Sequence, residues 1–108
     1  MNIIESNKYK KTYKKIIKDK HLVKEEQELN MLIGIIETYN NLQSLMSSVY
    51  QAKYDIRQKE GNLKEYISAS LSKRVRLIMR PVSELPYDYL VIEDIELIEI
   101  NDDHYKRV

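Results

Sequence analysis

The first half of the chain places apolar side chains at helical spacing. Tyr9, Tyr13 and Ile16 recur every three or four residues, with lysines on another face, so the pattern predicts an amphipathic helix over about residues 7–19. Ser6 stands directly before this segment and is of a residue type that suits the N-cap position.

A second helix is predicted over residues 24–40, where acidic side chains at the start favour a helix N-terminus. Its apolar stripe consists of Leu29, Leu32, Ile33 and Ile36. Residues 42–52 are expected to add one or two further helical turns, and residues 2–4 to form a short first strand.

The second half changes to the alternation of a β-sheet. Residues 66–72 and 74–80 alternate polar and apolar side chains, with the turn between them at Ser72-Lys73-Arg74. A further turn is expected around Gly61-Asn62, before the first of these strands.

The last predicted strand spans residues 89–100, after a loop over residues 82–88. A short strand, two helices and an antiparallel meander together indicate an α+β domain. We therefore expect a single domain over residues 1–108, with two N-terminal helices packed on one face of a mainly antiparallel sheet of about four strands.

Charge is segregated along the chain, although the net charge is only +1. Residues 8–24 hold eight lysines and one acid, and residues 53–80 hold eight bases and three acids. Residues 25–52 hold four glutamates and no base, and residues 81–103 hold eight acids and no base. Such blocks give separate surfaces for an anion such as RNA and for a basic partner, or they are simply the solvated faces of ordinary elements.

Several classes of chemistry find no support in the sequence. There is no cysteine, and the two histidines, His21 and His104, do not make a zinc-ligand pattern, so we expect no metal and no cofactor. No glycine-rich phosphate loop or Gly-x-Ser-x-Gly motif is present. No apolar run approaches the roughly 20 residues of a membrane helix, and no signal peptide is recognisable, so a cytoplasmic protein without a membrane partner is expected.

The two alternating segments predict a basic sheet face. If their apolar residues face the helices, the outward side chains are Tyr66, Ser68, Ser70, Arg74, Arg76 and Arg80. Arginine matches phosphate oxygens, and tyrosine offers a ring for base stacking, so this face is a candidate RNA surface. The alternative is an ordinary solvated sheet face. His104, directly after the last strand, is a candidate acid or base, or an exposed terminal residue.

Several short motifs carry a resemblance to a known family. They are Ser6-Asn7-Lys8-Tyr9-Lys10-Lys11-Thr12-Tyr13-Lys14-Lys15, Gly61-Asn62-Leu63-Lys64-Glu65-Tyr66-Ile67-Ser68, Arg74-Val75-Arg76-Leu77-Ile78-Met79-Arg80, Ile95-Glu96-Leu97-Ile98-Glu99-Ile100 and Asp103-His104-Tyr105. In this order they resemble the RelE/ParE superfamily of toxins, and most closely its HigB-like (plasmid maintenance killer) branch.

The resemblance implies a toxin of a type II toxin–antitoxin system that cuts messenger RNA on the ribosome without a metal. It assigns Arg76 to the scissile phosphate, His104 to proton transfer, Tyr105 to proton transfer or stacking, and Asp103 to orienting His104. It further implies RNA contacts by Arg57, Lys59, Lys73, Arg74, Arg80 and Tyr66. The implied partners are the ribosome, messenger RNA and a cognate antitoxin of the helix-turn-helix type, through which the complex reaches operator DNA.

The sequence also departs from the family pattern. The terminal cluster reads Asp-His-Tyr where this branch often reads Asp-Tyr-His, and no histidine occurs around residues 57–59. These departures leave a non-catalytic alternative open, in which the chain acts by binding a protein such as DNA gyrase or is a degenerate toxin. A third possibility is a small interaction protein whose lysine-rich helix binds acidic partners nonspecifically.

Overall fold

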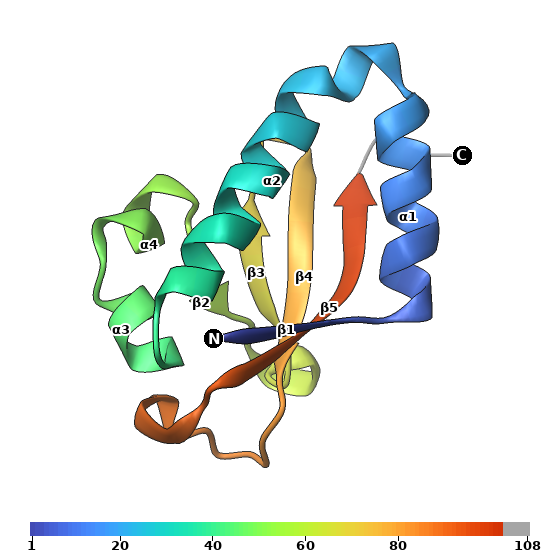
Figure 1. Cartoon of the computed structure of the whole chain (residues 1–108). Coiled ribbons are helices and arrows are strands. Elements are labelled where there is room, and N and C mark those ends of the chain that lie inside the picture. Colours follow the sequence, from blue (N-terminus) through green and yellow to red (C-terminus); the bar gives the residue numbers. More distant parts are fainter. Residues whose placement is uncertain (103–108) are drawn as a thin grey trace.

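The computed structural model describes residues 1–102, with most helices early in the chain and most strands late (Figure 1). The helical elements are α1 (Asn7–Lys18), η1 (Lys20–Leu22), α2 (Val23–Thr38), α3 (Leu42–Met46), α4 (Val49–Lys53), η2 (Gly61–Leu63) and η3 (Tyr89–Val91). The strands are β1 (Asn2–Glu5), β2 (Arg57–Gln58), β3 (Ile67–Ser70), β4 (Val75–Pro81) and β5 (Asp94–Asp102).

The strands form one five-stranded sheet in the order β1-β5-β4-β3-β2. β1 pairs parallel to β5, and all other neighbours are antiparallel. The first strand of the chain therefore lies beside the first half of the last one, from Asp94 to Leu97. Figure 1 shows α1 and α2 as an antiparallel pair on the same side of this sheet, with α1 beside β5.

Local sequence signals start and stop the helices as expected. The Ser6 hydroxyl accepts a hydrogen bond from the backbone N–H of Tyr9 at 3.0 Å and so caps α1. The Asp19 carboxylate accepts a hydrogen bond from the N–H of His21 at 2.9 Å. Asp19 is thus both the C-cap of α1 and the N-cap of η1. The predicted helices over 7–19 and 24–40 are confirmed, with ends shifted by one or two residues.

The core lies between the helices and one face of the sheet. From α1 and α2 it takes Tyr9, Ile16, Leu29, Leu32 and Ile36. From β3, β4 and β5 it takes Ile67, Ala69, Val75, Leu77, Met79, Ile95, Leu97 and Ile100. The strand residues alternate along each strand except at a register shift beside Ile78, so the remaining side chains of these strands face away from the helices.

One prediction about the elements was wrong. The last strand begins at Asp94, whereas residues 89–91 form the short helix η3. There the Asp88 carboxylate accepts a hydrogen bond from the N–H of Leu90 at 3.1 Å, and this local capping bond overrides the apolar run that suggested a strand. The mainly antiparallel sheet is confirmed and has five strands. The strand that the sequence did not indicate is β2, which is only two residues long and carries no periodic signal.

The other connections agree with the sequence. Residues 42–52 divide into α3 and α4, because Ser48 caps a new helix by accepting from the N–H of Tyr50. The expected turn at residue 61 is present, and Gly61 has φ +64°, a left-handed conformation that favours glycine. No described helix combines the length and the apolar character that crossing a membrane requires.

Candidate functional site

The side chains of β3, β4 and β5 that point away from the helices form rows across the sheet, and we call this side the outer face. One row is Ser70, Arg76 and Asn101, because Ser70 pairs with Arg76 and Arg76 pairs with Asn101. Directly opposite residues on one face have Cβ atoms roughly 5 Å apart. The register therefore places the Arg76 side chain between a hydroxyl and a carboxamide.

The next row of the outer face is less open than the sequence suggested. Ser68 pairs with Ile78, and Ile78 pairs with Glu99. Ser68 is only 2% exposed and Ile78 only 6% exposed. Neighbouring side chains thus shield the middle of the outer face, and the accessible polar groups lie at its two ends.

The Arg76 end of the outer face carries several cations. A cavity of about 480 Å³ is lined by Arg76 together with Lys53, Ser70, Leu71, Ser72 and Lys73. Lys53 comes from the last turn of α4, and Lys73 comes from the turn between β3 and β4. No ion pair within residues 1–102 involves Arg76, Lys53 or Lys73, so the positive charge of this end is available to an anion.

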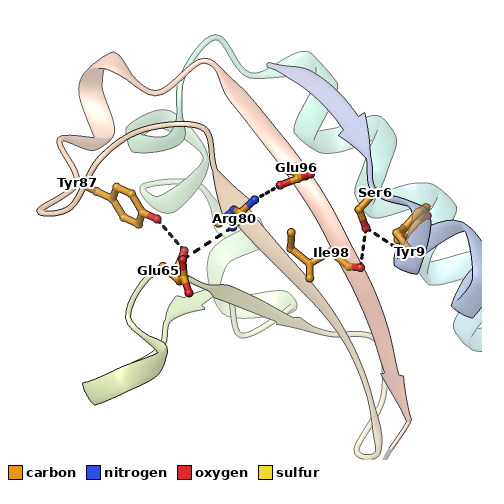
Figure 2. A network of polar contacts seen from close by, with 7 residues as sticks. All are labelled: Ser6, Tyr9, Glu65, Arg80, Tyr87, Glu96 and Ile98. Carbon is orange, nitrogen blue, oxygen red and sulfur yellow. Dashed lines mark hydrogen bonds and ion pairs between the residues drawn. The ribbon is translucent and has the colours of Figure 1, made fainter.

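The opposite end of the outer face is held by a polar network (Figure 2). Arg80 on β4 donates a hydrogen bond of 2.5 Å to the Glu96 carboxylate on β5, and a second carboxylate, that of Glu65, lies 3.9 Å away. The hydrogen bond with Glu96 raises the pKa of Arg80. Tyr87 donates to the backbone carbonyl oxygen of Glu65 at 2.8 Å and fixes the loop against this pair. The positive charge of Arg80 is thus balanced by neighbouring carboxylates.

The C-terminal half of β5 is supported by α1 instead of a strand. β1 pairs with β5 only as far as Leu97. Beyond that point the Ser6 hydroxyl donates to the carbonyl oxygen of Ile98 at 2.8 Å (Figure 2), and the Thr12 hydroxyl accepts from the N–H of Ile100 at 3.0 Å. These bonds satisfy backbone groups of an edge strand and fix where β5 ends, next to Arg76.

The remaining residues predicted to bind RNA are spread around the outer face. Arg57 on β2 pairs with Ser68 in the sheet, and its guanidinium binds Asp55 at 2.7 Å. Lys59 follows β2, and its backbone N–H donates to the carbonyl oxygen of Tyr66 at 2.9 Å. Tyr66 is half-buried just before β3, and Arg74 is exposed in the turn before β4. Lys73 lies beside Arg76, whereas Arg80 and Tyr66 lie at the opposite end of the outer face, near Glu65 and Glu96.

The predicted catalytic residues at the tail lie beyond the part of the chain that the structure describes. Asp103, His104 and Tyr105 follow Asp102, the last described residue. Their roles therefore stay predictions from the family resemblance. Among residues 1–102, no group of three or more His, Asp or Glu side chains is arranged to hold a metal ion.

Sequence reasoning missed two residues of the Arg76 end. Lys53 was counted only as part of a basic segment, because nothing local indicates that α4 turns toward the hairpin. Asn101 was not considered, because its register against Arg76 depends on an irregularity between β4 and β5 beside Ile78. The ion pair of Arg80 with Glu96 was also missed, because Glu96 lies on the neighbouring strand, 16 residues later in the chain.

No family model matches the chain, and no curated protein matches it in sequence. Solved structures match it over nearly its whole length. A YoeB/ParE toxin from Agrobacterium tumefaciens aligns over 94% of this chain and 98% of its own chain, with 12% identity and a TM-score of 0.64.

Two further matches are toxins solved in complexes. The E. coli DinJ–YafQ toxin–antitoxin complex aligns over 99% of this chain and 97% of its own chain, with 17% identity and a TM-score of 0.65. The heterotetrameric YoeB–YefM toxin–antitoxin complex from Staphylococcus aureus aligns over 94% of both chains, with 16% identity and a TM-score of 0.61. At such low identity the likeness shows the fold, and it confirms the RelE-like α+β architecture expected from the sequence.

Proposed function

We propose that this chain is the toxin of a type II toxin–antitoxin pair, and that it cuts messenger RNA on the ribosome as a metal-independent endoribonuclease. The observation that carries the proposal is the Arg76 end of the outer face, where Arg76, Lys53 and Lys73 line one cavity without an ion-pair partner among residues 1–102. The RelE-like fold agrees with it. Assignment to the HigB-like branch rests on the sequence motifs.

The chemistry divides between cations and proton carriers. The 2′-hydroxyl of one nucleotide attacks the adjacent phosphorus, a base takes its proton, and an acid protonates the departing 5′-oxygen. Arg76 binds the scissile phosphate and stabilises the negative charge that develops on it. His104 and Tyr105 exchange the protons, and Asp103 orients His104. Arg57, Lys59, Lys73 and Arg74 hold the flanking backbone of the RNA.

Chain connectivity supports this division of roles. His104 is two residues beyond Asp102, and two peptide units span at most about 7 Å. Asp102 is the strand partner of Val75, the residue before Arg76. The described part of β5 therefore ends beside the arginine proposed to bind the phosphate, and the predicted proton carriers follow it directly in the sequence.

The proposed partners are the ribosome, its messenger RNA and a cognate antitoxin in the cytoplasm. The solved DinJ–YafQ and YoeB–YefM complexes contain an antitoxin bound to a toxin of this fold. An antitoxin of the helix-turn-helix type would supply any contact with operator DNA. The exposed cations of the Arg76 end give such a partner a surface that it must cover to block RNA binding.

The proposal is tested by comparing wild type with Arg76→Gln and His104→Ala in a purified translation system, with cleavage mapped by primer extension. Lys14→Gln is the matched control, because it removes one positive charge from an exposed position on α1 that lines none of the cavities described here. Loss of phosphate stabilisation costs on the order of 100- to 1,000-fold in rate, so Arg76→Gln should nearly abolish cleavage while Lys14→Gln leaves it intact. Equal cleavage by all four proteins would refute the site.

A second candidate is a non-catalytic protein that acts by binding a partner such as DNA gyrase. It is favoured by the position of His21, the one histidine within residues 1–102, which lies in η1 and not on the outer face. Expression of the chain distinguishes the two functions. Growth arrest with intact message and damaged DNA would support the gyrase target, and arrest with fragmented message supports the nuclease.

A further inference from the structure

A cavity of about 960 Å³ lies where the last turn of α1 and η1 diverge from the end of β5. On the helical side it is lined by Thr12, Lys15, Ile16 and Lys18. On the strand side it is lined by Ile100 and Asn101. Ile16 and Ile100 both belong to the hydrophobic core, so an apolar surface forms the floor, and the flexible lysine stems form the rim.

Asn101 connects this cavity to the Arg76 end of the outer face. It lines the cavity and is also the direct strand partner of Arg76. Its Oδ1 atom is buried and has no hydrogen-bond partner within residues 1–102, so a ligand reaches it only when the carboxamide turns toward the cavity. A buried acceptor without a donor costs free energy, and a ligand that supplies an N–H or O–H in the cavity recovers it.

The charges around the cavity favour an anion. Lys8 is paired with Glu99 at 3.0 Å, whereas Lys15, Lys18 and Lys20 take part in no ion pair within residues 1–102. Three acids line the cavity as well: Glu99 is paired with Lys8, Asp19 accepts from the N–H of His21, and Asp102 is buried. Four lysines against three acids leave the cavity with a net charge of +1. Lysines in the last turn of α1 also offset the negative end of the helix dipole.

From this arrangement we infer that the cavity is a nucleotide subsite, which binds the RNA nucleotide next to the phosphate held by Arg76. The base rests on the apolar floor, the Asn101 Oδ1 accepts a hydrogen bond from an N–H of the base, and Lys15 and Lys18 bind the neighbouring phosphate. The inference rests on the proposed function. RNA is favoured over a peptide because Asn101, which lines the cavity, is the strand partner of Arg76, and because the cavity combines an apolar floor with three lysines that have no ion-pair partner within residues 1–102.

The test measures binding of a non-cleavable, 2′-fluoro single-stranded RNA of about ten nucleotides by fluorescence anisotropy at several salt concentrations. Asn101→Leu keeps the branched shape and removes the acceptor, and the double variant Lys15→Gln/Lys18→Gln removes two cations from the rim. Lys10→Gln/Lys14→Gln is the matched control, with the same charge change on exposed positions of α1 outside the cavity.

Asn101→Leu is expected to weaken binding about tenfold with an unchanged salt slope. Lys15→Gln/Lys18→Gln is expected to weaken binding at least tenfold and to lower the salt slope by about 1.4, while the control pair changes affinity less than about twofold. Circular dichroism melts verify that each variant is folded. The lysines are exposed, so the lysine pair keeps the inference testable even if Asn101→Leu misfolds.

Arg76→Gln, measured in the same assay and for cleavage on the ribosome, separates the two proposals. If it loses both cleavage and binding while the cavity variants bind as wild type does, the subsite is refuted and the nuclease stands. If cleavage is absent from wild type but the cavity variants still weaken RNA binding, the nuclease is refuted and the subsite stands. Loss of antitoxin affinity with normal RNA affinity in the cavity variants would overturn the subsite in favour of a protein partner.

Discussion

Replacing Thr12 with valine removes the hydroxyl group that joins α1 to the edge of β5 and leaves the side-chain shape almost unchanged. The Thr12 Oγ1 accepts from the N–H of Ile100 at 3.0 Å and donates to the carbonyl oxygen of Tyr9 at 2.9 Å. Beyond Leu97 none of the strands within residues 1–102 covers this edge, so in the valine variant the Ile100 N–H loses its partner. Ile100 is only 4% exposed, which limits replacement by water.

The expected cost follows from this geometry. A typical hydrogen bond contributes about 1 kcal/mol, and a donor left buried and unsatisfied costs about 1–3 kcal/mol. We therefore expect Thr12→Val to lower the free energy of unfolding by about 1.5 kcal/mol. In a chain of this size that loss corresponds to a decrease in Tm of roughly 6 °C. With a urea slope on the order of 1.5 kcal/mol/M, the unfolding midpoint falls by about 1 M.

Urea titration followed by circular dichroism gives the stability, and amide hydrogen exchange gives the location. Exchange at the Ile100 amide should accelerate in Thr12→Val more than at the paired amides in the centre of β4. Thr12→Ser is the control, because it retains the hydroxyl and should stay within about 0.5 kcal/mol of wild type. Equal stability of the valine and serine variants, with unchanged exchange at Ile100, would refute the idea that α1 side chains complete this edge.

Two further predictions concern the outer face and the core. Glu96→Gln keeps an acceptor for Arg80 but removes its counter-charge. The free energy of unfolding from thermal melts should therefore fall by about 0.5 kcal/mol, while affinity for the RNA probe rises about twofold. Glu37→Gln, with the same charge change on α2, should change neither the stability nor the RNA affinity. Burial, with a smaller contribution from Glu28, raises the pKa of Tyr54 to about 12. The unfolded chain therefore loses this proton at lower pH than the folded chain, so stability declines as pH rises from about 10 toward 12. Tyr54→Phe should flatten that decline in pH-dependent urea titrations, and an unchanged slope would contradict the assignment.

The local signals of the sequence were sufficient for most of the elements. Ser6 and the spacing of Tyr9 and Ile16 located α1, and the alternation around Ala69 and Leu77 located the hairpin of β3 and β4. Before η3, the capping hydrogen bond of Asp88 competes with an apolar run, and the strand predicted from that run is replaced by a short helix. A strand as short as β2 exists only because β3 lies beside it, so no periodic pattern could reveal it.

The candidate site was less predictable than the fold. Arg76 was identified because strand alternation alone places it away from the core. The same rule gave Arg80 an equal role, and it could not show that Glu65 and Glu96 neutralise that arginine. Partners of this kind come from other strands and loops, and their identity depends on register.

Hydrophobic periodicity and capping residues are properties of neighbouring positions, so the sequence by itself determined the helices, the main strands and which face of the hairpin carries arginine. Register, the route of α4 and the pairing of β1 with β5 are decided by burial of the whole core against the sheet, and they reach between residues far apart in the chain. Only the tertiary structure could therefore distinguish Arg76, which has no ion-pair partner within residues 1–102, from Arg80, which is paired with carboxylates. It alone brings Lys53 to Arg76 and places Asn101 between Arg76 and the cavity beside α1.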